Sequence, residues 1–567
     1  MIHNLPPGLL MIFGGLLIPL FYRRAQSALP LILSASSLVL FLLTPSGEYG
    51  EINLFGQSLM MVRIDSLSRI FGIIFHIAAM VSSIYALHLR DTKQHVAAMI
   101  YAGGAIGACC AGDLITLFLF WELTALSSVI LVWASNTESS YRSGMRYLII
   151  QVGSGVLLLS GAIMRYNETG SIQFDLLLQP SGAMSWGTLL IFLAFGIKCA
   201  FPLLHNWLQD AYPEATVTGT VFLSAFTTKL AIYALARGFA GAESLIWIGC
   251  AMTLFPIVFA VIENDLRRVL AYSLNNQLGF MVVGIGIGTE LAINGTAAHA
   301  FCHILYKALL FMSMGAVLHR VGTVKATELG GLYKSMPWTT LFCVIGAGSI
   351  SGFPLLSGFV SKSMILTAAA EEHQFWVWIV LLIASAGVME HSGIKIPFFA
   401  FFAHDSGQRP KEAPWNMLVA MGIAATFCVG LGVGYPWLYK LLPGEAHYEP
   451  YTWSHVVTQM QLLLFAALAF VVLMYSGFYP AELRKINLDT DWLYRRLLPN
   501  ILGRLGLTIY AMDSGVRQGV MALVRAVIRS LGLRFGEHGV LGGTWSTGVM
   551  AVWATILLCL CLLINYL

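Results

Sequence analysis

Charged residues are scarce in this chain of 567 residues: only 11% are aspartate, glutamate, lysine or arginine. A soluble globular protein would carry about a quarter. The sequence also has no polar stretch before residue 478 that is long enough for a catalytic domain, which disfavours a membrane-anchored enzyme. The net charge of +4 is small, and no nucleic-acid partner is expected.

Cysteine pairs with metal-ligand spacing are absent too. The nine cysteines all fall in apolar stretches and form no CxxC pair, so we interpret them as buried thiols. The chain therefore shows no ligand set for an iron–sulfur cluster, and we expect neither a metal nor a cofactor. Haem ligation by histidine pairs stays open, although nothing in the sequence requires it. Any redox chemistry is expected to belong to another chain.

Apolar residues, by contrast, make up 57% of the chain, and its mean hydropathy is +0.76. Apolar runs of about 18 residues or more are typical of membrane-spanning helices. We therefore expect one all-α polytopic membrane bundle of about sixteen helices, at 6–22, 28–44, 68–88, 96–112, 113–134, 144–164, 186–206, 216–238, 243–262, 268–288, 291–318, 338–370, 374–402, 416–436, 457–477 and 544–566. The first run has no small-residue cleavage site, which favours a retained helix over a signal peptide.

The positions of lysine and arginine support this topology. If the N-terminus lies outside, the loops after odd-numbered helices carry 22 of the 32 lysines and arginines, and the opposite loops carry only 5. Positive loops normally face the cytoplasm. The asymmetry predicts a protein of the bacterial inner (cell) membrane with both termini on the periplasmic side.

The remaining five basic residues are all lysines inside or close to apolar segments: Lys198, Lys229, Lys307, Lys362 and Lys395. A charge at the bilayer centre costs about +2.5 to +3.5 kcal/mol even on the lenient insertion scale, so such residues are functional candidates. A buried lysine, unlike an arginine, can release its proton. Glu122 in "DLITLFLFWELTALSS" is the carboxylate available to pair with one of them. The alternatives are a structural Glu122 satisfied by hydroxyl groups and a Lys229 that snorkels to the interface.

Two lysine-bearing segments contain a helix breaker. In "GIKCAFPLLHNWL", Pro202 follows Lys198 by four residues, and in "GAGSISGFPLLSGFVSKSMIL", Pro354 precedes Lys362. Proline removes a backbone donor and breaks a helix, and broken helices with an ion site at the break recur in transporters. The spacing predicts two related halves of five helices each, although direct similarity between the halves is weak.

A further segment, "HAFCHILYKALLFMSMGAVLH", places three protonatable side chains on one helix face, at His299, His303 and Lys307. A stripe of this kind inside a membrane favours a proton relay. Structural hydrogen bonding and a zinc-binding histidine pair are the alternatives, but no third metal ligand lies nearby. The secondary candidates, which we expect nearer the membrane surface, are His205, Glu390, His391 and Lys395.

Six stretches occur in order along residues 60–400: "DLITLFLFWELTALSS", "IKCAFPLLHNWLQDAYPEA", "LSAFTTKLAIYALAR", "ENDLRRVLAYSLNNQLGFM", "HAFCHILYKALLFMSMG" and "SGFPLLSGFVSKSMIL". Together they resemble the antiporter-like membrane subunit family. This family comprises the proton-pumping membrane subunits of respiratory complex I and the A and D subunits of Mrp-type sodium/proton antiporters. The chain is most similar to the D type.

The resemblance implies a core of fourteen helices with two inverted five-helix repeats and broken helices 7 and 12. The expected parts are helices 1–3 at 1–95, the repeats at 96–240 and 241–405, helices 14–15 at 406–478, a cytoplasmic amphipathic segment at 479–543 and a last membrane helix at 544–567. It also implies that Glu122 is the family's glutamate on helix 5, paired with Lys198 on helix 7. Lys229 then matches the central lysine of helix 8 and Lys362 the exit residue of helix 12, while the two histidines correspond only loosely.

The resemblance leaves three functions open. The first is a proton-translocating subunit of a multisubunit monovalent cation (Na+ or K+)/H+ antiporter. The second is the pumping subunit of a complex I-like redox complex, and the third is a membrane partner that supplies proton flux to an inorganic-carbon uptake complex. All three require other membrane subunits as partners. For the amphipathic segment at 479–543, we weigh a brace along a neighbouring subunit against a surface helix on the cytoplasmic leaflet.

Overall fold

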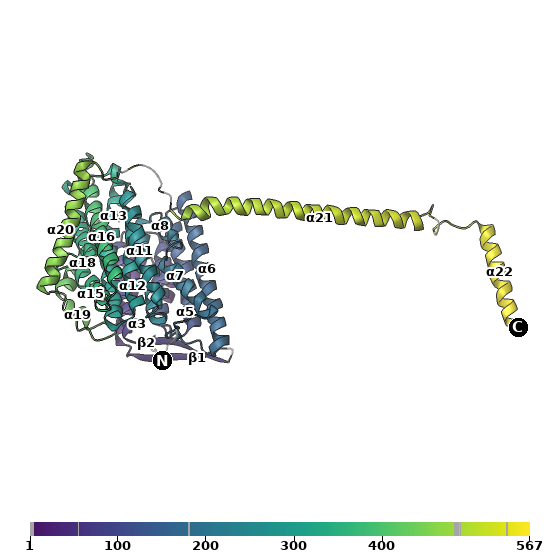
Figure 1. Ribbon diagram of the computed structural model, residues 1–567, viewed down its shortest axis with the longest axis horizontal. Coiled ribbons are helices and arrows are strands. Elements are labelled where there is room, and N and C mark those ends of the chain that lie inside the picture. The colour runs from purple at the N-terminus through teal and green to yellow at the C-terminus, as the bar shows by residue number, and fades with distance from the viewer. Residues whose placement is uncertain are drawn as a thin grey trace. The chain divides into compact units, whose positions relative to one another are not determined.

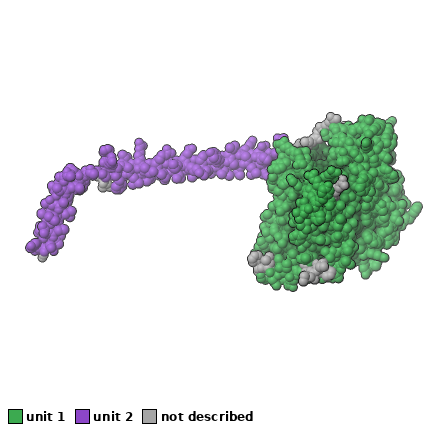
Figure 2. Space-filling model, turned by 180° about the vertical axis from the view of Figure 1, so that it is seen from behind, with its two compact units in different colours: residues 1–487 green, residues 488–567 purple. Residues whose placement is uncertain are grey.

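The structure is a computed structural model that describes residues 5–54, 56–179, 182–480, 483, 487, 489–539 and 542–566. The chain divides into two compact units, residues 1–487 and residues 488–567 (Figure 2). Each unit is described by itself.

The first unit is a bundle of roughly parallel and antiparallel helices (Figure 1). Its first half contains α1 (Leu9–Leu17), the 3-10 turn η2 (Ile18–Leu20), α2 (Arg23–Leu43), α3 (Ser66–Tyr85), α4 (Thr92–Cys109), α5 (Leu114–Trp133), α6 (Glu138–Thr169), α7 (Trp186–Cys199), α8 (Asn206–Ala211), α9 (Val217–Ala225) and α10 (Thr227–Gly238). The rest contains α11 (Glu243–Ile262), α12 (Leu266–Ile287), α13 (Glu290–Val321), the 3-10 turns η3 (Ala326–Glu328) and η4 (Leu332–Lys334), α14 (Pro337–Ser351), α15 (Ser357–Glu371), α16 (Phe375–Val388), the π-helix η5 (Met389–Ile394), α17 (Lys395–Pro397), the π-helix η6 (Phe398–Phe402), α18 (Trp415–Val433), α19 (Tyr435–Tyr439) and α20 (Trp453–Ser476).

Helices long and apolar enough to cross a membrane dominate the described residues: eleven meet both criteria. Each of the sixteen apolar segments expected from the sequence falls on helical structure. The expected polytopic all-α architecture is therefore confirmed.

A β-hairpin at one end of the bundle was not expected. Strands β1 (Gly47–Leu54) and β2 (Gln57–Ile64) pair antiparallel, with Gly47 opposite Ile64 and Leu54 opposite Gln57. The free edge of β2 bonds to the α4–α5 link, because Arg63 N donates to Cys110 O (2.6 Å) and Gly112 N donates to Met60 O (3.1 Å). The hairpin thereby covers the helix ends on this side (Figure 1).

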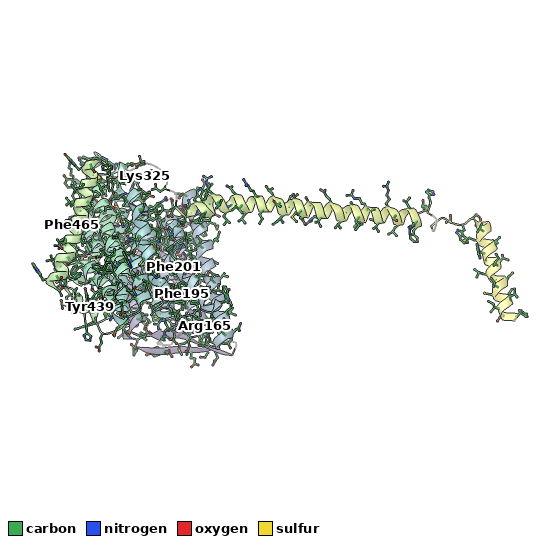
Figure 3. The ribbon with its side chains drawn as sticks, viewed as in Figure 1. Arg165, Phe195, Phe201, Lys325, Tyr439 and Phe465 are labelled. Carbon is green, nitrogen blue, oxygen red and sulfur yellow. The ribbon has the colours of Figure 1, made fainter. Side chains whose placement is uncertain are left out.

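The two broken helices enter the bundle from opposite ends. The segment before α7 is tied to the hairpin, since Arg63 Nη1 donates to Asp175 Oδ1 at 2.7 Å. The start of α13 lies at the same end, because Glu445 N donates to Glu290 Oε1 (2.7 Å) and Ser66 Oγ, beside the hairpin, donates to Pro443 O (3.2 Å). The chain then returns along α13, so α14 starts at the other end. Figure 3 likewise shows Arg165 and Tyr439 at the hairpin end and Lys325 at the opposite one.

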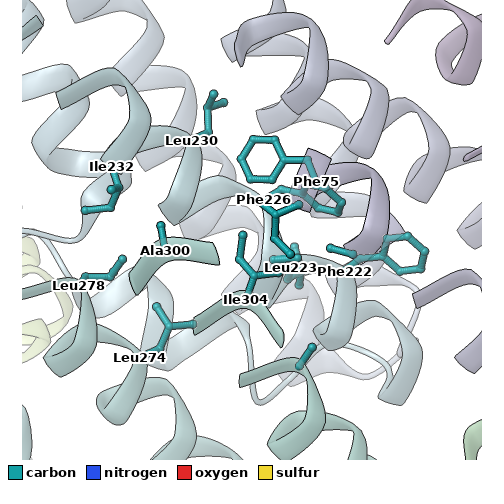
Figure 4. Packing of buried hydrophobic residues seen from close by; sticks show 14 of the residues in the cluster. Phe75, Phe222, Leu223, Phe226, Leu230, Ile232, Leu274, Leu278, Ala300 and Ile304 are labelled. Atoms are coloured by element: carbon teal, nitrogen blue, oxygen red, sulfur yellow. The ribbon is translucent and has the colours of Figure 1, made fainter. Parts of the chain in front are cut away.

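The deepest part of the core is formed by α13 and by the pair α9–α10. An 18-residue stretch of α13 is 94% buried and one of α9–α10 is 100% buried, against 17% for α20. Aliphatic and aromatic side chains such as Phe75, Phe226, Leu278 and Ile304 pack in this region (Figure 4). Lys229, His299, His303 and Lys307, which lie on these helices, are thus kept away from lipid.

The second unit contains the π-helix η7 (Leu493–Leu497), the 38-residue helix α21 (Leu498–Phe535) and α22 (Thr547–Tyr566). Neither α21 nor α22 has a buried residue. The apolar α22 is one of the eleven candidate spans.

Candidate functional site: a buried row of lysine and histidine side chains

Both expected helix breaks are present, and they share one local structure. The sequence Phe-Pro-Leu-Leu follows a residue with positive φ in each, Ala200 (φ 61°) after α7 and Gly352 (φ 78°) after α14. Its first leucine is also left-handed, with φ 71° at Leu203 and 70° at Leu355. Such conformations are costly for non-glycine residues and mark functional sites. The repeated four-residue motif is a signal of the internal repeat in addition to the spacing of the two lysines.

Lys198, in the last turn of α7, is fully buried. Its ammonium donates to the backbone oxygen of Trp121 (2.6 Å) and to Thr124 Oγ1 (2.8 Å), both on α5. It also lies 4.3 Å from the centre of the Trp121 ring, which adds a cation–π contact. Two residues of α5 that did not stand out in the sequence therefore hold this lysine.

Glu122, one residue after Trp121, is half-buried and forms no ion pair with Lys198 within 4 Å. Its carboxylate lies against α6 at Gly155, where even a β-carbon would clash with Oε1. That oxygen has no hydrogen-bond partner among the described residues. Lys198 is nevertheless the charge with which Glu122 interacts electrostatically. The structure thus shows the two charged residues as neighbours on α5 and α7 whose side chains do not meet.

Lys229 lies at a helix interruption that the sequence did not predict. The expected single helix at 216–238 is split at Phe226 into α9 and α10. The ammonium of Lys229 donates to the carbonyl oxygen of Ser224 at 2.6 Å, on the far side of the interruption. Lys229 is fully buried, so it does not snorkel to the surface of the unit.

The stripe on α13 faces α12 and α15. His299 bonds to Ser361 Oγ through Nδ1 (3.1 Å) and to the Tyr306 hydroxyl through Nε2 (3.4 Å), and that hydroxyl donates to Gln277 Oε1 (3.1 Å). The His303 ring lies 5.2 Å from the Tyr306 ring. Structural hydrogen bonding therefore applies to His299.

His303 and Lys307 differ from His299, because neither ring nitrogen of His303 nor the Lys307 ammonium has a partner among the described residues. Buried polar groups are normally satisfied by protein or by ordered water. Both side chains are 0% exposed, so their polar atoms are shielded from the surface of the unit. Within the described ranges, no three His, Cys, Asp or Glu side chains gather as a metal site needs.

Lys362 lies in the second turn of α15, directly after Ser361, and is 3% exposed. Its ammonium donates to the carbonyl oxygen of Ile350 on α14 (2.9 Å) and lies 5.2 Å from the centre of the Phe280 ring. The second broken helix thus carries a lysine that reaches back across its own break.

Of the secondary candidates, His391 in η5 is fully buried and interacts electrostatically with Lys307 and Lys362 of the row. The ammonium of Lys395 donates to the backbone oxygens of Val261 (2.6 Å), Glu263 (2.7 Å) and Ala260 (3.2 Å), at the end of α11. His205 precedes α8 and lies 4.4 Å from the Phe255 ring, while Glu390 is in η5. These positions suit helix ends and bends.

Sequence reasoning missed the uncharged polar residues that surround the row. Thr124, Gln277, Tyr306 and Ser361 contact the row, and seven further buried, uncharged side chains have polar atoms without a partner among the described residues: Gln151, Gln209, Thr228, Asn275, Ser349, Ser357 and Ser385. The stretch "SLNNQLG" at 273–279 was a readable signal, because buried amides in an apolar helix are expensive.

The row contains two groups of electrostatically interacting side chains. His303 interacts with Lys229, Lys307, His299 and Lys362, and Lys198 interacts with Glu122. Adding or removing one proton therefore changes the energy of protonating the neighbouring groups.

Comparison with known proteins agrees with this picture. Residues 111–387 match the family model described as NADH:quinone oxidoreductase/Mrp antiporter, TM. The chain is 28% identical over 433 residues to hydrogenase-4 component B of Escherichia coli (68% of this chain, 64% of the relative). It is 32% identical over 316 residues to the D subunit of the Na(+)/H(+) antiporter from Alkalihalophilus pseudofirmus (53% of this chain, 64% of the relative). The chain thus spans 64% of the length of either relative.

Two solved structures share the fold. A chain of the Mrp complex from Dietzia sp. superposes with a TM-score of 0.74 at 21% identity, covering 99% of this chain and 63% of that one. A chain of the archaeal membrane-bound sulfane sulfur reductase gives 0.70 at 20% identity, covering 98% and 99%. From its helical spans, this chain is a multi-pass membrane protein, and its residues 111–387 match the NADH:quinone oxidoreductase/Mrp antiporter module.

Proposed function

We propose that the chain is the proton-translocating subunit of a multisubunit monovalent cation (Na+)/H+ antiporter. The observation that carries the proposal is the bonding of its buried lysines. Lys198, Lys229 and Lys362 are held by carbonyl and hydroxyl oxygens, and none of them forms an ion pair with a described carboxylate. An amine in such a setting can give up its proton without leaving a carboxylate unpaired.

The proposed route follows the row Glu122, Lys198, Lys229, His303, Lys307, His299 and Lys362. Protons enter near Lys198 and Lys229 and leave by Lys362, across water held by the unpartnered amides and hydroxyls. Glu122 favours the charged form of Lys198 when the two side chains approach, so their separation releases the proton. His205, Glu390 and Lys395 stay secondary candidates. The ammonium of Lys395 bonds to backbone oxygens at a helix end, as in a helix cap.

The proposal also covers the membrane, the partner subunits and the exchanged ions. The distribution of lysine and arginine supports the bacterial inner (cell) membrane, with both termini and the hairpin on the periplasmic side. The partners are other membrane subunits, and the exchanged ions are H+ with Na+ or K+. The relative from Alkalihalophilus pseudofirmus, whose name is that of an antiporter subunit, supports this assignment.

A redox-driven pump is the second candidate. Hydrogenase-4 component B, from Escherichia coli, matches 68% of this chain, so a relative whose name is not that of an antiporter also matches most of it. In that case NADH, formate or hydrogen oxidation by other chains would drive the same row. A proton-flux partner of an inorganic-carbon uptake complex would also use this row of buried side chains. No residue of the row distinguishes the three functions.

Two experiments test the proposal. In vesicles containing the assembled complex, Glu122→Ala and Lys229→Ala should abolish cation-dependent proton flux while the protein remains inserted; full flux in either variant contradicts the route. Mass spectrometry of the gently solubilised complex tests the energy source. Small hydrophobic chains and a second antiporter-like subunit support exchange, whereas iron–sulfur, flavin or nickel subunits support the redox-driven pump.

A further inference from the structure

The second helix break exposes two consecutive backbone oxygens, those of Ile350 and Ser351. In a continuous helix, each would accept from the backbone four residues later, but α14 ends at Ser351 and the chain turns at Pro354. Side chains supply the donors instead. The Lys362 ammonium donates to Ile350 O (2.9 Å), and the side-chain amide of Gln459 donates to Ser351 O (3.3 Å). A glutamine and the exit lysine therefore share one broken helix end.

Gln459 is an uncommon residue for its helix. α20 lies at the edge of the bundle, and an 18-residue stretch of it is only 17% buried (Figure 1). Gln459 is nevertheless one of the three buried residues of α20, with Leu463 and Phe470, and is 8% exposed. Burying an amide on an apolar membrane helix costs free energy, which its hydrogen bond to the break offsets.

Contacts with both halves of the broken helix place this amide. One turn earlier on α20, the His455 ring stacks on the Phe359 ring of α15, with 4.4 Å between the ring centres. On the side of α14, Gly352 follows Ser351 with φ 78°, and a β-carbon there would lie 3.1 Å from the amide nitrogen of Gln459. One helix thus contacts the end of α14 and the start of α15.

We propose that Gln459 is a positioning residue for the proton on Lys362. This inference rests on the proposed function, in which Lys362 is the exit group. An ammonium forms a charge-assisted hydrogen bond and a neutral amine donates more weakly, so loss of the proton weakens the bond to Ile350 O. The amide of Gln459 has two N–H donors and carries no charge. It keeps the end of α14 supplied with a donor while Lys362 is neutral, which lowers the cost of releasing the proton.

Other titratable groups lie on the helices around α15. They are His299, Cys302 and His303 on α13, His391 in η5, Cys428 on α18 and His455 on α20. The histidines of α13 and η5 interact electrostatically with Lys362. All of these groups are kept in variants of Gln459, so a difference in pH dependence reports the loss of the amide.

The test measures proton flux in vesicles that contain the assembled complex, while the pH on the release side is varied. Without the Gln459 amide, the ammonium of Lys362 must serve both oxygens, so its proton is held more tightly. We expect Gln459→Leu to shift the midpoint of the flux to higher pH by about one unit. Gln459→Glu should shift it at least as far, because an ionised carboxylate cannot donate and attracts the ammonium.

Gln461, two residues later on α20 and exposed, is the matched control. The same two substitutions at Gln461 should leave the midpoint unchanged. Thermal unfolding of each complex checks the fold, and the isosteric Gln459→Glu carries the test if the leucine variant does not fold.

The outcomes separate this inference from the function on which it rests. A glutamine that only packs would lower the flux at every pH, so an unshifted midpoint in the folded variants, with normal wild-type flux, overturns the inference alone. A wild-type complex without proton flux overturns the proposed function and this inference with it.

Discussion

The ammonium of Lys362 donates a hydrogen bond of 2.9 Å to the carbonyl oxygen of Ile350. In a continuous helix that oxygen would accept from the backbone four residues later, but residue 354 is proline and has no N–H. The lysine that we assign to proton exit therefore also satisfies the carbonyl that the helix break exposes. Its protonation and the geometry of the break are coupled.

This coupling predicts different effects for two substitutions of Lys362. Lys362→Met leaves the Ile350 oxygen buried and unsatisfied, so we expect a loss of about 1–3 kcal/mol of stability together with loss of transport. Lys362→Gln can still donate to that oxygen, so it should lose transport while keeping most of the stability. Thermal unfolding of the purified complex and flux in vesicles measure the two effects. Wild-type flux in the glutamine variant would remove Lys362 from the route.

Gly155 provides a way to move the Glu122 carboxylate without removing its charge. A β-carbon at Gly155 would overlap Glu122 Oε1, whereas a β-carbon at Gly153, also on α6, meets no atom within 4 Å. We expect Gly155→Ala to reduce proton flux at least about tenfold, since the carboxylate changes its distance from Lys198. Gly153→Ala is the matched control and should transport normally. Equal flux in the two variants would show that the position of Glu122 does not matter.

The Tyr306 hydroxyl joins the α13 stripe to α12, because it contacts both His299 Nε2 and Gln277 Oε1. Tyr306→Phe keeps the ring but breaks this link. We expect a drop in flux of several-fold with the protein still inserted and folded. Tyr435→Phe, which removes a hydroxyl bonded to Glu449 in a surface loop, serves as the control and should leave flux unchanged. Undiminished flux after Tyr306→Phe would argue that protons bypass His299.

We expect His88, between α3 and α4, to make the stability of the folded protein depend on pH. Burial and the neighbouring His319, Arg320 and His95 hold the pKa of His88 below its ordinary value. Its Nδ1 lies 3.0 Å from the Asn416 amide nitrogen of α18, and an amide N–H can donate only to an unprotonated Nδ1.

The folded state thus favours neutral His88, while the unfolded state binds the proton more readily. Stability should be constant above about pH 7 and fall as the pH drops below the ordinary histidine pKa of about 6.5. We expect His88→Gln to flatten this fall in the unfolding temperature. Asn416→Asp should reduce the loss of stability at low pH, because a carboxylate accepts a hydrogen bond from protonated His88. The exposed His447 is the control: if His447→Gln flattens the curve as much as His88→Gln does, His88 is not the titrating group.

The spans and the unusual lysines could be found in the sequence because each depends on local chemistry. Apolar length alone marks a membrane helix, and Lys198 and Lys362 stand out from their own neighbours. The breaks were also predictable, since the missing N–H of Pro202 and Pro354 disrupts a helix whatever surrounds it. The hairpin was missed because apolar length, which marks the membrane helices, does not mark a short, half-exposed pair of strands.

Tertiary structure decided the contacts that give these residues their roles. Which oxygen binds each ammonium, and whether Glu122 meets Lys198 or packs on Gly155, depends on the helices that become neighbours. The same holds for Ser361 beside His299 and for the interruption beneath Lys229. The sequence by itself determined which groups are protonatable inside the membrane, because composition and hydropathy belong to single segments. Only folding decided which of them are neighbours, because that depends on packing between helices far apart in the chain.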